Sequence, residues 1–194
     1  MKHNFHDKFL ATLTPYWIDT NDEIYFDPLA GTNSNYGETR RRGVEYEGRI
    51  DLQKFFSLLY LDKIELISNY NFEDARFVKG NNHKKFIPGV PRNQAGGGIL
   101  IGFLKNFDFS LMYRYVGSQF AINDLANAIT PNKHYAVLDG KLSFKQKNYE
   151  IFAGINNILN EFYTPYITYS TFNGNKALFP APGRNFNMGV NIKF

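Results

Sequence analysis

Arg40, Arg41 and Arg42 form the densest cluster of cationic side chains in the sequence. Guanidinium groups bind phosphates and carboxylates through paired hydrogen bonds, so the cluster predicts contact with an anionic group. Arg40 and Arg42 share the parity of the apolar residue Val44, whereas Arg41 has the opposite parity. In a strand these two sets point to opposite faces. A solvated cluster paired with nearby glutamates explains the residues equally well.

A second candidate group is His83, with the asparagines and lysines around it at 81–85. These side chains could contact an anionic ligand, although a solvated loop explains the composition more simply. Tyr163, Tyr166 and Tyr169 make a further segment aromatic. Flat aromatic faces suit catecholate or macrocyclic ligands, and an interfacial belt or loop packing explains them equally well.

Patterns that would indicate catalysis or a cofactor are missing. The sequence contains no Gly-rich phosphate cradle, no Gly-x-Ser-x-Gly elbow and no His-Glu-x-x-His. His3, His6 and His134 show no metal-ligand spacing, and the absence of cysteine removes thiolate ligands. Basic residues are spread among acidic ones despite a net charge of +4, which disfavours a nucleic-acid partner. We therefore expect neither an enzyme nor a metal or cofactor site.

Composition limits the elements that can position these residues. The 194 residues are 43% hydrophobic with a mean hydropathy of -0.38, and 17% are aromatic. The longest apolar stretches, at 55–61 and 95–104, fall short of the roughly 18 to 20 residues that a spanning helix needs. Aromatic residues favour strands and membrane interfaces. This combination suits a transmembrane β-barrel.

A two-residue alternation runs through most of the chain. At its end, apolar residues share one parity and asparagines share the other, the apolar set being Phe186, Met188, Val190, Ile192 and Phe194. The same alternation recurs in five further segments, at 44–52, 64–72, 107–115, 136–144 and 149–155, and less cleanly at 8–26 and 92–104. Period-two alternation predicts strands, so we expect about eight.

The predicted connections alternate in length. Tight turns at 105–106 and 146–148 alternate with polar segments at 28–36, 79–90, 117–133 and 164–183. Short periplasmic turns and long extracellular loops are typical of an antiparallel transmembrane β-barrel. A soluble β-sandwich is the competing all-β fold, but its strands usually have about 5 to 6 residues, about half the length expected here.

Four motifs in order carry a family resemblance: Tyr-Gly-Glu-Thr-Arg-Arg-Arg-Gly-Val-Glu at 36–45, Ile-Pro-Gly-Val-Pro-Arg-Asn at 87–93, Asn-Asn-Ile-Leu-Asn-Glu-Phe-Tyr at 156–163, and Pro-Ala-Pro-Gly-Arg-Asn-Phe at 180–186. Together with the terminal Phe194, the sequence resembles the C-terminal barrel segment of a TonB-dependent outer-membrane receptor. The resemblance covers residues 1–194 as one unit.

Such receptors have a 22-stranded barrel closed by a plug, and they import ferric siderophores, haem or cobalamin with energy relayed by TonB. The resemblance implies that the chain supplies the last eight strands, in the outer membrane of a Gram-negative bacterium, with no counterpart of the plug domain or signal peptide. Transport would then need the missing plug and N-terminal strands, and TonB would act only through the plug. A ferric siderophore is the expected iron-complex ligand, ahead of haem or cobalamin.

On this basis the candidate residues receive roles. Arg40 and Arg42 are expected to contact lipopolysaccharide phosphates at the lipid-facing rim. Arg41, His83 and the three tyrosines 163, 166 and 169 are expected to contribute to the iron-complex site. Phe194 resembles the signal read by the barrel-assembly machinery, or is simply a lipid-facing rim residue. The alternative function is a self-contained eight-stranded outer-membrane barrel with a structural or adhesive role.

Overall fold

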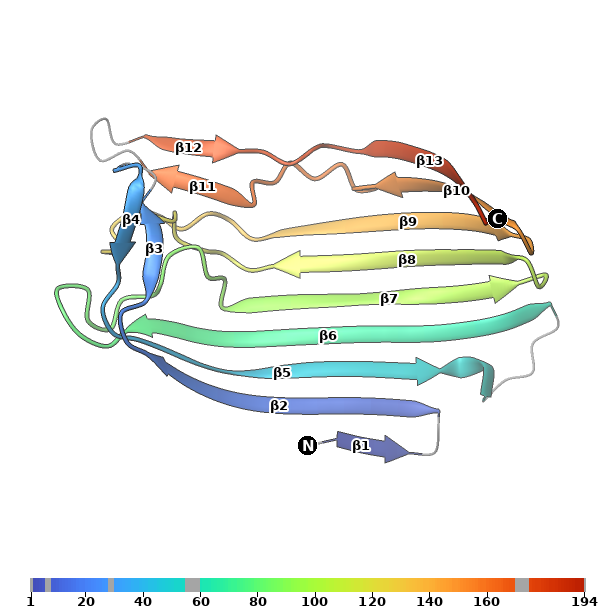
Figure 1. The fold of residues 1–194 in the computed structure, drawn as a ribbon, viewed down its shortest axis with the longest axis horizontal. Coiled ribbons are helices and arrows are strands. Elements are labelled where there is room, and N and C mark those ends of the chain that lie inside the picture. Colours follow the sequence, from blue (N-terminus) through green and yellow to red (C-terminus); the bar gives the residue numbers. More distant parts are fainter. Residues whose placement is uncertain (1, 6–7, 28–29, 55–59, 170–174, 194) are drawn as a thin grey trace.

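The computed structural model describes residues 2–5, 8–27, 30–54, 60–169 and 175–193. Nine strands form one antiparallel sheet in the order β1-β2-β5-β6-β7-β8-β9-β10-β13 (Figure 1). Their bounds are β1 (Lys2–Phe5), β2 (Phe9–Thr20), β5 (Thr39–Asp51), β6 (Leu61–Phe77), β7 (Asn93–Phe103), β8 (Phe107–Val116), β9 (Tyr135–Lys145), β10 (Tyr149–Asn156) and β13 (Asn185–Ile192). Each of the eight predicted segments therefore contributes one strand to this sheet, and the short β1 is added to them.

The segment 8–26 differs from the single long strand that its composition indicates. It contains β2 and the separate strand β3 (Ile24–Asp27), which pairs with β4 (Thr32–Asn35) outside the main sheet. The break falls at Asp22, where the backbone takes a φ of 56°. A short polar side chain tolerates this left-handed conformation, which a strand cannot accommodate. A second hairpin, β11 (Tyr166–Tyr169) with β12 (Lys176–Phe179), lies within the last long connection.

The strand registers place the apolar residues of neighbouring strands opposite one another. Val44 lies opposite Phe72, and Tyr46 lies opposite Tyr70. The same alignment continues to Met188 of β13, which lies opposite Ala153. A slip of one residue would move every side chain to the other face, so these registers produce one continuous apolar face, here called the outward face.

The outward face remains exposed. Met188 is 88% and Phe186 is 73% exposed, and other large apolar side chains of this parity are exposed as well. In the described part of the chain no second sheet packs on this face. A water-soluble monomer rarely leaves so large an apolar area uncovered, whereas a lipid-facing sheet requires it.

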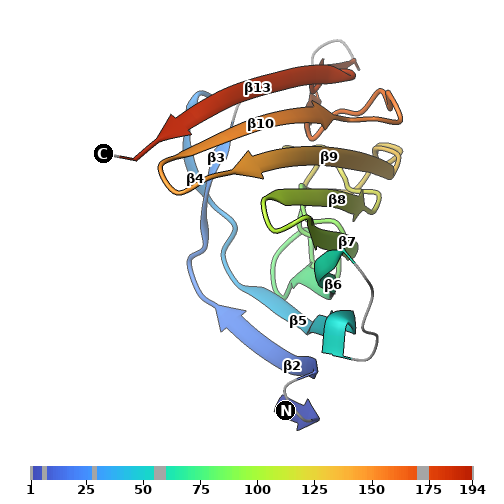
Figure 2. The same cartoon turned by 90° about the vertical axis from the view of Figure 1, so that its right-hand side faces the viewer.

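The other face, here called the hollow face, carries the polar parity. Figure 2 shows the sheet curved like part of a barrel wall, with the β3–β4 hairpin on its hollow side. Tyr16 of this parity covers Gly43 on the adjacent strand, where an added Cβ would lie 2.0 Å from the carbonyl oxygen of Phe72. Glycine therefore permits a close strand approach there.

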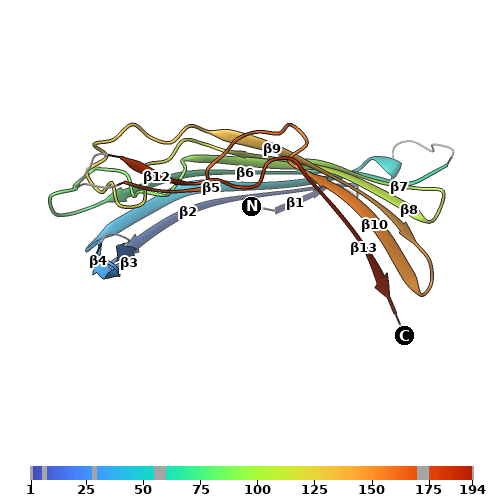
Figure 3. The ribbon, with the colours of Figure 1, turned by 90° about the horizontal axis from the view of Figure 1, so that it is seen from above.

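The connections divide by length between the two ends of the sheet, as the sequence predicts. The described parts of segments 21–38, 78–92, 117–134 and 157–184 lie at one end, whereas 104–106 and 146–148 turn tightly at the other (Figures 1 and 3). The connection from β5 to β6 begins with the 3-10 helix Leu52–Lys54. No helix within the described ranges is both long and apolar enough to cross a membrane. Phe194 lies outside the described residues.

The buried core lies beneath the long connections. Ala75, Phe77 and Ile87 form one cluster, and Val116, Tyr135 and Val137 form another. Except for Ile87, which belongs to a connection, these residues have the parity of the hollow face and lie near the strand ends. Burial there holds the connections against the sheet rather than one sheet against another.

Candidate binding surfaces of the sheet

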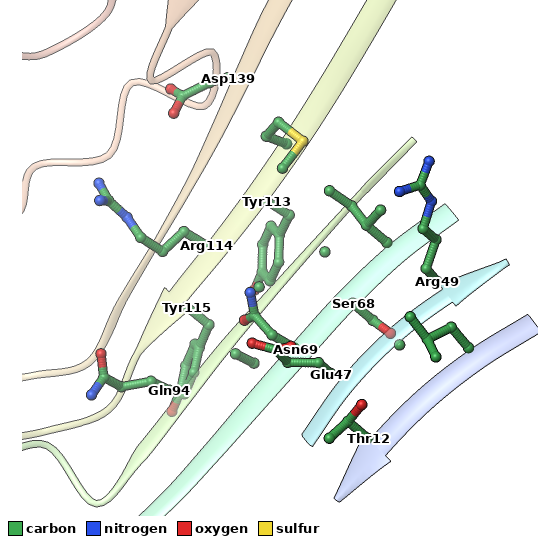
Figure 4. Close-up of a pocket in the computed structure, with 17 residues that line it drawn as sticks. Thr12, Glu47, Arg49, Ser68, Asn69, Gln94, Tyr113, Arg114, Tyr115 and Asp139 are labelled. Atoms are coloured by element: carbon green, nitrogen blue, oxygen red, sulfur yellow. The ribbon is translucent and has the colours of Figure 1, made fainter. Parts of the chain in front are cut away.

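A polar groove of about 610 Å³ crosses the middle of the hollow face (Figure 4). Its polar lining comes from adjacent strands and includes Thr12, Glu47, Arg49, Asn69, Gln94, Arg114 and Asp139. Gly96 lies on the hollow face beside Asn69, and an added Cβ there would lie 2.6 Å from Oδ1 of Asn69. Glycine at this position therefore lets the Asn69 amide lie over the neighbouring strand.

Several polar groups of the hollow face have spare bonding capacity. The Arg49 guanidinium is paired with Glu65, but Arg114 has no ion-pair partner within the described ranges. Oδ1 of Asn71 is buried without a hydrogen-bond partner in the structure. Buried polar atoms are normally satisfied by protein or water. The groove is therefore suited to water or to a hydrophilic ligand or protein segment.

Arg41 lies on the hollow side, as its parity predicts, and its charge is already shared. The guanidinium binds Glu23 at the start of the β3–β4 hairpin, and its Nη1 lies 3.2 Å from Oε1 of Glu73. The hydroxyl of Thr39 also donates to Glu23. This network attaches the hairpin to the sheet, and the ligand-binding role of Arg41 stays a prediction.

Arg40 and Arg42 lie on the outward face beside the exposed indole of Trp17. The Arg40 guanidinium carbon is 4.7 Å and that of Arg42 is 5.8 Å from the ring centroid. Arg40 binds the carboxylate of Asp19, with Nε 2.6 Å from Oδ1. Arg42 binds the buried carboxylate of Asp74, with Nη2 2.9 Å from Oδ2. Cation–π contacts of this kind fix both guanidinium groups over the indole.

The buried carboxylate of Asp74 also binds a second arginine, Arg76. Nε of Arg76 lies 2.9 Å from Oδ1 of Asp74, and the Arg76 guanidinium covers the ring of Phe86 at 4.1 Å. These arginines, together with His83 and Lys84, line a small cavity of about 200 Å³. We call Arg40, Arg42, Arg76 and Lys84 the outward basic cluster. The sequence signal for its extension was the pair of charged residues at 74 and 76, which interrupt the apolar parity of β6.

The remaining predicted ligand residues do not gather at one place. His83 is exposed on the connection 78–92, where its Nδ1 lies against the carbonyl oxygen of Val78. Tyr163 stacks on Tyr135 with ring centroids 4.5 Å apart. Tyr166 and Tyr169 belong to β11, and their odd spacing places them on opposite faces of that strand. Their binding roles stay predictions.

Asparagine side chains join the long connections to one another. The amide of Asn127 accepts from the N–H of Phe86 at 2.6 Å and donates to its carbonyl oxygen at 3.0 Å. Asn123 forms the same reciprocal pair with the backbone of Tyr169. These side-chain amides thus take the place of a neighbouring strand for part-buried backbone groups. The connections 78–92 and 117–134 and the β11–β12 hairpin are therefore cross-linked at the end of the sheet.

No triad of histidine, aspartate or glutamate side chains within the described ranges could hold a metal ion. The comparisons with known proteins instead define the class. A family model described as TonB dependent receptor-like, beta-barrel matches residues 1–158. The chain therefore belongs to this family of transport receptors, whose barrels lie in the outer membrane of Gram-negative bacteria. No curated protein sequence matches the chain significantly.

Solved structures show the same fold. The siderophore receptor PiuA from Acinetobacter baumannii superimposes over 100% of the chain with a TM-score of 0.75 at 20% identity. The ferric yersiniabactin uptake receptor FyuA from Yersinia pestis does so over 100% with a TM-score of 0.77 at 20% identity. The ferric citrate transporter FecA covers 96% of the chain, again with a TM-score of 0.77 at 20% identity.

The chain spans only 27% of PiuA, 28% of FyuA and 29% of FecA. The predicted membership and the predicted antiparallel all-β barrel segment are confirmed by these matches. Closure into a barrel is a separate matter, because within the described residues β1 and β13 are the two edges of an open sheet.

Proposed function

We propose that the chain forms the C-terminal part of an outer-membrane receptor barrel for TonB-dependent uptake of an iron complex. The main sheet is curved and has one apolar and one polar face, and this arrangement carries the proposal. Its outward face exposes Met188, Val190 and their equivalents as lipid-facing residues, and its hollow face exposes polar groups to a lumen. Long connections at one end are typical of the extracellular side of such barrels.

The open edges imply that uptake needs further strands. Unpaired backbone groups facing lipid each cost several kcal/mol, so β13 requires a partner in a membrane. We therefore propose that the receptor has additional N-terminal strands and a plug, and that TonB acts only through that plug. The barrel-assembly machinery would receive the strands, and Phe194 is the proposed recognition residue.

The names of the similar structures support an iron complex as cargo, since PiuA is a siderophore receptor and FyuA takes up ferric yersiniabactin. We place a ferric siderophore ahead of haem or cobalamin. Tyr166, which is 38% exposed on the β11–β12 hairpin, is one of the proposed contact residues. Tyr163, Tyr169, His83 and Arg41 are proposed as further contacts.

Deletion of the coding segment from the source bacterium tests the proposal. Uptake of radiolabelled ferric siderophores, haemin and cobalamin is measured under iron limitation, with and without TonB. We expect loss of TonB-dependent uptake of one ferric siderophore. Undiminished uptake of all iron complexes, accompanied by reduced surface adhesion, would instead favour the alternative of a self-contained structural or adhesive barrel.

A further inference from the structure

The β3–β4 hairpin exposes two apolar side chains on the face that points away from the sheet. Tyr25 stacks on Tyr36, and Tyr36 packs edge-on against Phe77 in the core of the hollow face. Because successive side chains of a strand point to opposite sides, Ile24 and Phe26 lie on the other face, where they are 70% and 55% exposed. The hairpin lies on the hollow side of the sheet (Figures 2 and 3), so this face is directed toward the interior of the proposed barrel.

Strand β4 adds amide groups to the same face of the hairpin. The register places Asn35 opposite Ile24 and Asn33 opposite Phe26. The Asn35 amide is already bonded to Asp22, whereas the exposed Asn33 side chain has no hydrogen-bond partner within the described ranges. We call Ile24, Phe26 and Asn33 the hairpin face. It combines apolar contact area with a free amide, which suits a ligand made of methylene groups and amide or hydroxamate groups.

Carboxylates gather on the hollow face next to the hairpin. Arg41 binds both Glu23 and Glu73. Glu45 and Glu47 follow on the same face of β5, and both are exposed without an ion-pair partner among the described residues. Four carboxylates thus face one guanidinium group, an excess of three negative charges. We call Glu45 and Glu47 the acidic row, which leads from the hairpin into the polar groove that Glu47 lines.

The nearest arginines of β5 and β6 do not compensate this charge. The outward basic cluster lies on the other face of the sheet, and its predicted contact with lipopolysaccharide stays a prediction. Arg114 is on the hollow face, but β8 is three strands from β5, a separation of about 14 Å that exceeds the Debye length of about 8 Å. Like charges brought together at a binding surface oppose association. A strongly anionic ligand is therefore disfavoured beside the hairpin.

We propose that the hairpin face and the acidic row bind a cationic ferric hydroxamate, an inference that rests on the proposed function and names its ligand class. Hydroxamate groups each bring a single negative charge, so a tris-hydroxamate neutralises Fe(III), and a pendant ammonium group makes the complex cationic. Catecholate groups bring twice that charge, and a tris-catecholate complex is trianionic. Methylene linkers of the hydroxamate would contact Ile24 and Phe26, and Glu45 would attract the ammonium group.

Uptake of radiolabelled iron by the complete receptor in the source bacterium tests this ligand class. The probes are ferrioxamine B, which carries an ammonium group, its neutral N-acetyl derivative, and the trianionic ferric complex of enterobactin. We expect receptor-dependent uptake of ferrioxamine B, with a KM about fivefold lower than that of the N-acetyl derivative. An equal KM for both derivatives, or receptor-dependent uptake of anionic complexes alone, would overturn this inference and leave the proposed function intact. Absence of receptor-dependent uptake for every iron complex would overturn both.

Two variants separate the charge contact from the apolar contact. Glu45→Gln should raise the KM for ferrioxamine B about fivefold and remove the preference over the N-acetyl derivative. Phe26→Ser should raise the KM for both derivatives about tenfold. Glu161→Gln removes an exposed carboxylate from the connection 157–184 and should leave both values unchanged. Unchanged KM values in the first two variants, or an equal loss in all three at matched surface amounts, would overturn the site.

Discussion

At the residue scale, Arg41 illustrates how the hollow face fixes its connections. Its guanidinium lies between Glu23 and Glu73, and all three side chains are less than a third exposed. Arg41→Gln would leave two carboxylates without their counterion. We expect the attachment of the β3–β4 hairpin to weaken by about 1 to 3 kcal/mol, measured as faster hydrogen exchange of residues 21–38.

Arg40→Gln is the matched control for this variant. Arg40 is adjacent in sequence and also forms an ion pair, but its partner Asp19 is 52% exposed. Exposed ion pairs contribute little to stability, so exchange in residues 21–38 should remain nearly unchanged. If residues 21–38 exchanged hydrogen as slowly in Arg41→Gln as in Arg40→Gln, the hairpin would be held by packing alone.

Tyr36 gives the same hairpin a dependence on pH. Burial, followed by the influence of Tyr25 and Glu23, raises the pKa of Tyr36 from 10.0 to about 12. The ring stacks on Tyr25 at 3.9 Å and packs edge-on against Phe77 at 5.1 Å. The folded state therefore holds the phenol proton more tightly than the unfolded state does.

A raised pKa sets the direction of the pH effect. The stability that the protonated Tyr36 side chain contributes to the folded state is fully present below pH 10, and it is lost as the pH rises toward about 12. We expect protection of residues 21–38 from protease to fall across this window. In Tyr36→Phe, which keeps the packing but cannot ionise, this specific loss should disappear, and an ultraviolet titration should lack one tyrosine with a pKa of about 12. An unchanged profile would contradict the assignment.

At the scale of elements, the long connections depend on Asn127. Its amide satisfies both backbone groups of Phe86, and its own backbone has a φ of 51°. Asn127→Gly permits that backbone conformation but removes the amide. We expect the attachment of residues 78–92 to residues 117–134 to weaken by about 1 to 3 kcal/mol, because two part-buried backbone groups lose their partner.

Hydrogen exchange of residues 78–92 measures this effect. Asn132→Gly provides a comparison, because the Asn132 side chain donates to Thr164 in a different connection. Exchange at 78–92 should rise in the first variant and stay unchanged in the second. A rise in both would show that the connections respond as one cooperative unit.

At the scale of the whole molecule, the polarity of the two faces of the main sheet determines which face contacts lipid and which contacts water. Met188→Arg would place a charge in the outward face, where arginine near the middle of a bilayer costs about 2 to 4 kcal/mol. Asn187→Arg adds the same charge one residue away on the hollow face. We expect the first variant, within the complete receptor, to fail to assemble in the outer membrane and the second to assemble, as measured by heat-modifiable gel mobility.

The opposite result would contradict the membrane assignment. If the chain folded cooperatively in buffer and Met188→Arg left that fold intact, the outward face would be in contact with water. Met188, which is 88% exposed, would then be an ordinary water-exposed surface residue. The fold of the family would remain, but the lipid-facing role of this sheet would not.

Local patterns in the sequence predict the long strands of the main sheet, their two faces and the family. Alternation at 44–52 or 185–194 identifies a two-faced strand because successive side chains point to opposite sides. The direction in which Arg41 points follows from the same rule. The long and short connections were predictable because turn residues and alternation are both local patterns.

Which side chains meet across the sheet follows from the fold and not from the alternation. Glu23 reaches Arg41 because the chain turns at Asp22, and Asp74 joins Arg42 to Arg76 because β5 and β6 pair in one register. Asn127 reaches Phe86 from a connection 41 residues away. Such contacts depend on register and on loop conformation, which a periodic pattern does not encode, because alternation assigns a side chain to a face and leaves its neighbours undefined.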